Sequence, residues 1–411
     1  MTSGRMQLAA SSGGNKALFV SGIGMISSPD PSCDIYNSSL NFWSTANLSQ
    51  GRTYIASASN GTHCYFSGGA NDWILSVYDL VNVYNTTSSG WSIMHMSAAR
   101  SNLASAAAGS KVLFAGGAAS YQSMLFNLVD IYDTLSGAWT TATLSAARQN
   151  LCAATAGGKI VFAGGEDLNG VVSNVVDIYN VATGTWTADT LSVGRTRCAA
   201  TACGTKIFIG GGADASNTES NVVDIYDVVN GTWTTSTLSA ARSALTASTV
   251  GNYVLFAGGG NAGLTTVSTV VDIYDTLAGT WTTTNLTTGR ALAAATSLGN
   301  KFMIGGGSKS NGTPANTIEI YAATNVGLTL LNPDDQFTVY PNPVADLATI
   351  KLPDAVVDGS IEITNCLGQI VFSKTINASE VAVDTRAFEK GFYMVHIASG
   401  KTNLVKKFVK N

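Results

Sequence analysis

Arginine and aspartate recur through the chain at a spacing that could serve either chemistry or structure. The arginines are 47 or 48 residues apart, and five aspartates each precede an Ile-Tyr pair in the same register. A carboxylate close to a substrate can act as a general acid or base. A side chain that returns in nearly every repeat serves the repeat, so we predict that these aspartates bind arginine or turn N–H groups and that the chain is not an enzyme. The residues are Arg5, Arg52, Arg100, Arg148, Arg195, Arg242 and Arg290, with Asp34, Asp130, Asp177, Asp224 and Asp272.

The elements that carry these side chains repeat with the same period. Tyrosines follow the arginines in register, and six tryptophans each stand seven residues after a tyrosine. In the copy that begins at Arg148, short β-forming runs cover 151–155, 159–163, 175–179 and 186–191, with glycine in the tight turns. Repeats of this length, built from four short strands, predict a β-propeller with one blade per repeat. The sequence therefore predicts an all-β fold that opens with a seven-bladed propeller.

Composition narrows the classes of partner. Charged residues make up 12% of the chain and the net charge is −4, with no basic cluster in the repeats. Binding to nucleic acid needs many lysines or arginines on one face, so nucleic acid is an unsuitable partner. No apolar run approaches the roughly 18 residues that a transmembrane helix requires, so we expect no transmembrane segment.

The repeats resemble the kelch motif, whose marks are a glycine doublet after the second strand and then a tyrosine and a tryptophan at fixed distances. The resemblance covers residues 4–331, and every mark recurs in register. No helix follows the glycines, so they are predicted to shape turns rather than to bind phosphate. The doublets are Gly68-Gly69, Gly116-Gly117, Gly164-Gly165, Gly210-Gly211, Gly258-Gly259 and Gly305-Gly306, with Ser21-Gly22 as a degenerate first copy.

The repeat pattern departs from the kelch motif at both of its ends. The seventh repeat has Leu328 where tryptophan is expected, which predicts a weak outer strand. The first five residues overlay residues 191–195, so the chain opens in the middle of the pattern. We therefore expect a truncated N-terminus, with an outer strand and a signal peptide upstream of Met1 in the longer protein.

The pattern stops at about residue 337, and a different set of motifs begins. A Tyr-Pro-Asn-Pro opening, a Leu-Gly strand, a Lys-Gly-Phe-Tyr strand and a basic last strand follow one another. Their order and spacing resemble the type A C-terminal sorting domain of the type IX secretion system of Bacteroidetes. Several short strands without a helix also predict a small immunoglobulin-like β-sandwich. The motif residues are Tyr340, Pro341, Asn342, Pro343, Gly368, Gly391, Tyr393 and Lys407.

This resemblance implies a domain organisation and a route of export. We expect a propeller over 1–331, a linker over 332–336 and a sorting domain over 337–411. The sorting domain implies the type IX secretion machinery as a partner. The expected location is extracellular or the outer-membrane surface.

Histidine is too scarce to suggest a metal centre. Some kelch propellers are copper enzymes similar to galactose oxidase, which need two histidines and two tyrosines that converge on the axis. The three histidines are His63 at a strand start, His95 on an outer strand and His396 in the C-terminal segment. They do not converge, so we predict no metal and no cofactor.

The six cysteines are irregular in the repeats and contain no Cys-X-X-Cys motif. Cys33 and Cys198 stand where other repeats have small apolar residues, which favours buried thiols. Cys198 and Cys203 flank the end of one strand, so a disulfide between them in an oxidising compartment remains open.

The sequence also indicates which face could bind a ligand. In an up-and-down blade, the loops that follow the second and fourth strands share one face, and these are the longer and more variable loops. The resemblance to peptide-binding kelch propellers implies the same face. The candidate residues follow the recurring arginines or lie in the long loops: Tyr54, Trp73, Ser101, Asn102, Tyr121, Gln149, Asn150, Thr196, Arg197 and Ser243.

Uncharged polar groups and a few aromatic rings dominate these candidates. Such a surface suits a neutral glycan or a protein segment. The sequence thus predicts a secreted or cell-surface binding module. The alternative is the non-catalytic part of a secreted glycan-active enzyme whose catalytic region lies upstream.

Overall fold

The chain forms two compact units, described separately below. The computed structural model describes residues 1–25, 28–71, 76–324, 327–331, 337–352, 359–365, 368–376, 378–399 and 402–411. Most of residues 1–329 belong to the first unit, and residues 330–411 belong to the second. Loops connect strands in both units, and the described residues include a single short 3-10 helix, η2 (Ser120–Gln122).

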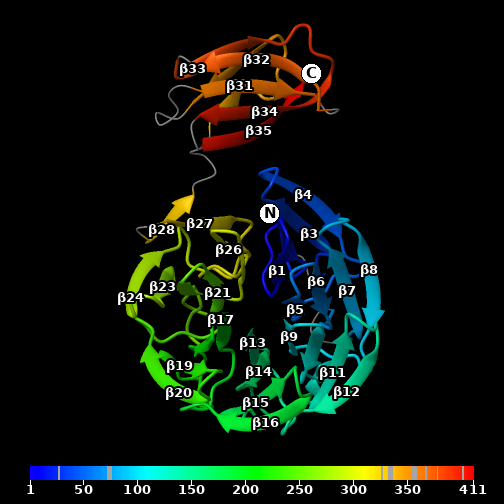
Figure 1. Ribbon diagram of the computed structural model, residues 1–411, viewed down its shortest axis with the longest axis vertical. Helices are drawn as coiled ribbons and strands as arrows, with labels where there is room; N and C mark the ends of the chain where they lie inside the picture. Colours follow the sequence, from blue (N-terminus) through cyan, green and yellow to red (C-terminus); the bar gives the residue numbers. More distant parts are fainter. Residues whose placement is uncertain are drawn as a thin grey trace. The chain divides into compact units, whose positions relative to one another are not determined.

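The first unit is a ring of seven four-stranded sheets, each built from consecutive strands (Figure 1). The first strands of neighbouring sheets contact one another around the centre of the ring. They are β1 (Ala9–Gly13), β5 (Ala56–Ser59), β9 (Ala104–Ala108), β13 (Cys152–Ala156), β17 (Ala199–Cys203), β21 (Thr246–Val250) and β25 (Ala294–Leu298). The second strands are β2 (Lys16–Val20), β6 (His63–Ser67), β10 (Lys111–Ala115), β14 (Lys159–Ala163), β18 (Lys206–Gly210), β22 (Tyr253–Ala257) and β26 (Lys301–Gly305).

The third and fourth strands complete each sheet toward the rim. The third strands are β3 (Ser32–Asn37), β7 (Leu80–Asn85), β11 (Leu128–Asp133), β15 (Val175–Asn180), β19 (Val222–Asp227), β23 (Val270–Asp275) and β27 (Ile318–Thr324). The fourth strands are β4 (Phe42–Asn47), β8 (Trp91–His95), β12 (Trp139–Thr143), β16 (Thr185–Thr190), β20 (Thr232–Thr237), β24 (Thr280–Asn285) and β28 (Gly327–Leu331). The predicted seven-bladed propeller is therefore confirmed.

The hydrophobic core lies between the blades. Small residues such as Ala104 and Ala106 occupy the crowded inner strands, and the second strands are buried along almost their whole length. Toward the rim, the tyrosines of the first six blades each face a tryptophan, as in Tyr226–Trp233 with ring centroids 4.7 Å apart. Trp139 of the third blade also packs against the cluster that includes Val83 of the second blade. The large rings thus fill the widening space between sheets.

The ring closes through contacts between its first and last blades. Ser12 Oγ donates to the carbonyl of Ser297 at 2.6 Å, and the N–H of Arg5 donates to the carbonyl of Ala315 at 3.1 Å. The seventh sheet takes its fourth strand from β28, despite Leu328 in place of tryptophan. The expectation that the ring needs an outer strand from upstream of Met1 is therefore wrong, because each sheet already has four strands.

The second unit is a β-sandwich, as predicted. One sheet has the order β29 (Thr338–Tyr340), β30 (Leu347–Lys351) and β33 (Glu380–Asp384). The other has the order β32 (Ile370–Ile376), β31 (Gly359–Thr364), β34 (Gly391–Ser399) and β35 (Thr402–Lys410). Residues of both sheets share one core, which includes Ile350, Val383, Ile361 and Val395. The expected boundaries at 331 and 337 stay a prediction, because the linker 332–336 lies outside the described residues.

Candidate ligand-binding face

The seven recurring arginines form a buried shell that holds each blade together. All of them are at most 2% exposed. Arg148 Nη2 donates to Asp177 Oδ2 at 2.7 Å, and Arg195 Nη2 donates to Asp224 Oδ2 at 2.6 Å. Charge-assisted hydrogen bonds of this kind are among the stronger contacts in a protein interior. Corresponding partners are Asp34 for Arg5, Asp130 for Arg100, Asp272 for Arg242 and Glu319 for Arg290.

The same carboxylates also fix the loop that enters each blade. The second oxygen of Asp177 accepts from the N–H of Ser145 at 3.0 Å, and that of Asp224 accepts from the N–H of Ser192 at 3.1 Å. Each accepted N–H belongs to the residue three positions before the arginine. Arginine and backbone together therefore engage both oxygens of the carboxylate. The prediction that the aspartates serve the blade is confirmed for these contacts.

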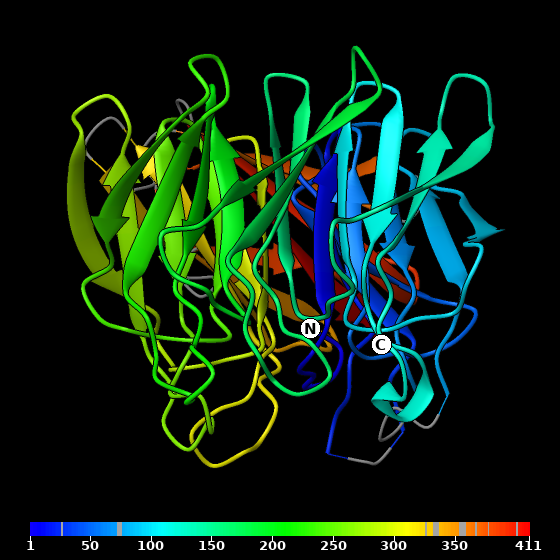
Figure 2. The same cartoon turned by 90° about the horizontal axis from the view of Figure 1, so that it is seen from below.

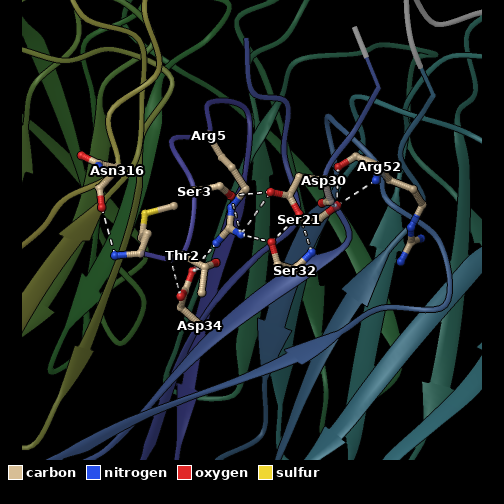
Figure 3. A network of polar contacts seen from close by, with 10 residues as sticks. Thr2, Ser3, Arg5, Ser21, Asp30, Ser32, Asp34, Arg52 and Asn316 are labelled. Carbon is tan, nitrogen blue, oxygen red and sulfur yellow. Dashed lines mark hydrogen bonds and ion pairs between the residues drawn. The ribbon is translucent and has the colours of Figure 1, made fainter. Parts of the chain in front are cut away.

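The first blade elaborates this arrangement into a larger polar network (Figure 3). Arg5 contacts Asp34 and Ser32, and Asp30 accepts from both Ser3 and Ser32. Burial alone would raise the pKa of Asp30, but the hydrogen bonds from the two serines outweigh it and the pKa is lowered. Ser21 Oγ accepts from the N–H of Arg52 at 2.7 Å, which connects this network to the second blade. The network therefore links two neighbouring blades on the loop face.

The second blade is the exception, because its arginine faces an amide. Arg52 donates to Asn82 Oδ1 and to the carbonyl oxygens of Gly68 and Leu80 at 2.6 and 2.9 Å. Asn82 Nδ2 in turn donates to Ser49 Oγ at 3.3 Å, whereas Asp177 accepts from the backbone N–H of Ser145 at the equivalent position. Burial lowers the pKa of Arg52 to about 10. The guanidinium is still charged at neutral pH, and no carboxylate of the described residues forms an ion pair with it.

The glycine doublets allow neighbouring blades to approach closely. Gly116 has φ of 66°, and a Cβ at this position would lie 2.7 Å from the carbonyl oxygen of Arg148 in the next blade. The following glycine, Gly117, donates its N–H to that same carbonyl at 3.0 Å. A side chain would disturb both the left-handed backbone and this hydrogen bond. The doublets are therefore structural, as the sequence indicated. In the fifth and seventh blades, however, the left-handed pairs are Gly211-Gly212 and Gly306-Gly307, one residue after the predicted Gly210-Gly211 and Gly305-Gly306, because Gly210 and Gly305 end the strands β18 and β26.

Two residues after each arginine, the backbone turns into a left-handed conformation. The φ angles at these seven positions lie between 51° and 56°, and six backbone N–H···O=C bonds of 3.0–3.3 Å connect neighbouring positions around the axis. For residues other than glycine and asparagine this conformation costs about 1 kcal/mol, so the ring of hydrogen bonds must offset it. We call these seven residues the axial ring: Gln7, Tyr54, Asn102, Asn150, Arg197, Ala244 and Leu292.

The axial ring and the residues after it line a hollow at the centre of the propeller. The hollow has a volume of about 240 Å³ and takes two residues from each blade. It lies at the end of the propeller where the first strand of each blade begins, beside the loops that lead into those strands. Figure 2 shows the longer loops gathered at one end of the strands and the tight turns at the other. The lining is completed by Leu8, Ile55, Leu103, Leu151, Cys198, Leu245 and Ala293.

The lining of the hollow is polar on one side and apolar on the other. Gln7 Nε2 donates to Tyr54 Oη at 2.6 Å, and Asn150 Nδ2 donates to Glu166 Oε1 at 2.8 Å. Arg197 donates to the carbonyl of Ala262 and to Asn217 Oδ1, both at 3.2 Å. Burial raises the pKa of Tyr54, so its hydroxyl stays protonated at neutral pH. The sixth and seventh blades contribute only the apolar side chains of Ala244, Leu245, Leu292 and Ala293.

The structure separates the predicted site residues into two groups. Four of them belong to the axial ring and line the hollow: Tyr54, Asn102, Asn150 and Arg197. Four others are at most 5% exposed and are absent from its lining: Ser101, Gln149, Thr196 and Ser243. These four form isolated β-bridges with the long loop of their own blade, as Gln149 does with Glu166. Their position directly after the arginine therefore turns the side chain into the blade.

The two remaining candidates cannot be placed in the same way. Trp73 lies outside the described residues, and the backbone of Tyr121 lies in η2 while its side chain is outside the described part. Sequence reasoning missed Gln7, which lines the hollow beside Tyr54. The available signal was its position two residues after Arg5, equivalent to the other members of the ring.

The sorting-motif residues fall into core and surface positions of the sandwich. Tyr393 is buried between Phe388 and Phe408, with ring centroids at 4.9 and 5.5 Å. Asn342 Oδ1 accepts from the N–H of Val409 at 2.9 Å, between the two cis-prolines Pro341 and Pro343. Tyr340 is 44% exposed. Lys407 lies over the Phe392 ring at 4.6 Å, and Gly368 and Gly391 have φ of 80° and 153°.

Neither a metal site nor a membrane helix is found in the described residues. No three histidine, cysteine, aspartate or glutamate side chains of the described chain gather closely enough to hold a metal ion. None of its helices has the length and apolar character needed to cross a membrane.

Two parts of the chain match known families. Residues 338–411 match the family described as Secretion system C-terminal sorting domain, and residues 194–236 match the Kelch motif. Among solved structures, one titled "Structure of YjhT" is similar with a TM-score of 0.55 and 15% sequence identity. The similarity covers 68% of this chain and 97% of that chain, and it shows a shared fold. No curated protein matches the chain.

Proposed function

Because this chain is a secreted kelch-repeat protein with a C-terminal sorting domain, we propose that its propeller is a binding module for a neutral glycan or a protein segment. The observation that carries this proposal is the variety of side chains in the axial ring. The seven positions share one backbone conformation and one pattern of hydrogen bonds, yet they contain six different residue types. The scaffold therefore does not determine which residue type stands at these positions, and recognition of a ligand can determine it instead.

The two sides of the hollow support a ligand with both polar and apolar surface. Amide, hydroxyl and guanidinium groups of five consecutive blades can donate to and accept from sugar hydroxyls or a peptide backbone. The apolar side, formed by Ala244 and Leu292 with their neighbours, can contact the carbon-rich face of a sugar or an aliphatic side chain. We extend the proposed face to Trp73 and Tyr121 on the basis of the sequence pattern.

The charge of the face supports a neutral ligand over a polyanion. Arg197 is the single cation among the described residues that line the hollow. Phosphate-rich ligands bind through several lysines and arginines and lose affinity steeply as salt rises. Binding here is expected to change little between low and high salt. The carboxylates buried beneath the face are already engaged by arginine and backbone N–H groups, which supports binding rather than catalysis.

The binding experiment uses the full chain and a matched control. The protein is screened against a glycan and peptide array, and the strongest ligand is titrated at low and high salt. Asn150→Ala and Tyr54→Ala should each weaken binding. Leu135→Ala should not, because Leu135 is 88% exposed at a tight turn of β11 and β12. Equal affinity in all variants, or affinity that collapses in salt, would contradict the proposed site.

The C-terminal domain is proposed to present Tyr340, Pro341, Asn342, Pro343 and Lys407 to the type IX secretion machinery. When residues 337–411 are deleted from the full-length protein, the shortened protein should accumulate in the periplasm of its native host, as measured by fractionation. Tyr393→Ala should have the same effect through loss of the sandwich core, whereas Tyr340→Ala should leave the fold intact. Normal surface display of the deletion protein would refute this role.

A further inference from the structure

Two cysteines from neighbouring blades touch beside the axial hollow. Cys152 begins β13 in the fourth blade, and Cys198 precedes β17 in the fifth. Their Sγ atoms are 3.1 Å apart, although the residues are separated by 46 positions in the sequence. The pair that the sequence left open is not formed, because Cys203 contacts the carbonyl of Gly251 and Thr276 Oγ1. Among the described cysteines, none is part of a disulfide in this structure.

At five of the six other blade interfaces the equivalent positions hold an apolar pair, and between the sixth and seventh blades they hold Thr246 and Ala293. Ala104 and Leu151 occupy these positions between the third and fourth blades and share one hydrophobic cluster. Ala56 and Leu103 share a cluster between the second and third blades, as Ala199 and Leu245 do between the fifth and sixth. At the interface of the fourth and fifth blades, both members of the pair are cysteine. A single cysteine here would be explained by packing, but two that face each other at one interface indicate a bond.

We propose that Cys152 and Cys198 are oxidised to an inter-blade disulfide during export. The sorting domain implies export through the periplasm, a compartment in which disulfides form and persist. The bond would join the fourth and fifth blades covalently at the wall of the hollow. It would also restrict the backbone of Arg197, the axial ring residue that directly precedes Cys198. This inference depends on export and is independent of the identity of the ligand.

The chemistry requires a disulfide-containing thiol oxidant, such as those of the bacterial periplasm. Cys198 lines the hollow and is the more accessible thiol, so its thiolate attacks the oxidant and forms a mixed disulfide. Cys152 then loses its proton and attacks Cys198 Sγ, which expels the oxidant as a dithiol. The two cysteines lose two protons and two electrons, and the oxidant gains them. The hydrogen bond between the two thiols raises the pKa of Cys152 and lowers the pKa of Cys198, in agreement with these roles.

The test is a disulfide map of the full chain secreted by its native host. The protein is unfolded and alkylated without a reductant, digested and analysed by mass spectrometry. We expect one linked peptide pair that contains Cys152 and Cys198, with Cys203 alkylated. Alkylation of both Cys152 and Cys198, or a link to Cys203 instead, would overturn the proposal.

Urea unfolding with and without reductant is a second test, and its result for the wild-type protein does not depend on how well a variant folds. The double variant Cys152→Ala/Cys198→Leu restores the apolar pair found at most other interfaces. Reductant should lower the urea midpoint of the wild-type protein and of Cys203→Ala, but should leave the midpoint of the double variant unchanged. A wild-type midpoint that ignores reductant would also overturn the proposal.

Discussion

Two positions in each repeat behave in opposite ways: the buried arginine and the axial ring residue two positions after it. The arginine is the same in all seven repeats and is buried against a carboxylate or amide of its own blade. The axial ring residue that follows it varies among glutamine, tyrosine, asparagine, arginine, alanine and leucine. The axial ring position nevertheless has the same left-handed backbone in all seven repeats. The recurring arginine is therefore required by the scaffold. The residue type at the axial ring position is not determined by the scaffold.

This contrast also explains why the recurring charged residues are poor candidates for chemistry. Arginine and aspartate are the residue types that most readily suggest a site, yet each carboxylate already accepts from a guanidinium and a backbone N–H. A group with both of its oxygens engaged and buried is not available to a substrate. The candidates for recognition are the less conspicuous amides and hydroxyls of the axial ring.

The largest effect is expected from breaking one buried ion pair. Arg195→Met leaves Asp224 buried without its charged partner, which typically costs about 3–5 kcal/mol. Urea unfolding of the purified propeller-containing chain measures the loss. Arg197→Met, two residues along, should change the stability by less than about 0.5 kcal/mol. Similar losses in both variants would remove the distinction between the two positions.

A smaller gain is expected where the second blade lacks a carboxylate. Asn82→Asp supplies a charged acceptor to Arg52, and a hydrogen bond between such groups is worth about 1.5–3 kcal/mol. Because pairing lowers the pKa of the new carboxyl in the folded state, the gain should be present above its unfolded pKa of about 3.9 and lost as the pH falls through the lower folded value. Unfolding midpoints at pH 7 and at acidic pH test this. The matched variant Asp130→Asn should lose stability at pH 7.

Changes in the axial ring should affect binding instead of stability. Asn150→Ala and Arg197→Ala should each lower the affinity for the ligand found by array screening about tenfold, which corresponds to about 1.4 kcal/mol. Isothermal titration of folded variants measures this change. If Arg100→Lys, a variant of the buried shell, were the one that selectively lost affinity while remaining folded, the roles assigned to the two positions would be reversed.

The smallest effect is expected from a polar substitution in the apolar part of the ring. Asparagine tolerates the left-handed backbone, so Ala244→Asn should alter the free energy of unfolding by less than about 0.5 kcal/mol. The same substitution at Ala106, inside β9, buries an amide in the core and should cost several times more. Equal losses in the free energy of unfolding for the two variants would show that the axial ring position does not tolerate a change of side chain.

The repeat pattern predicted the propeller because period, turn glycines and paired aromatic residues all require the same blade. The site was predicted less well. Ser101 and Gln149 stand one residue before the ring positions, and the structure shows their side chains buried in the blade because only the next residue adopts the left-handed turn toward the axis. The contact of Cys152 and Cys198 depends on neighbouring blades, which a pattern within one repeat does not describe.

Hydrogen–deuterium exchange of the full chain, with and without the ligand identified by array screening, tests the central claim most directly. The account predicts slower exchange in peptides that contain Tyr54, Asn102, Asn150 and Arg197, and no change at the tight turns such as that of Leu135. Protection confined to the tight turns or to the rim strands would contradict the assignment of the axial ring as the binding surface.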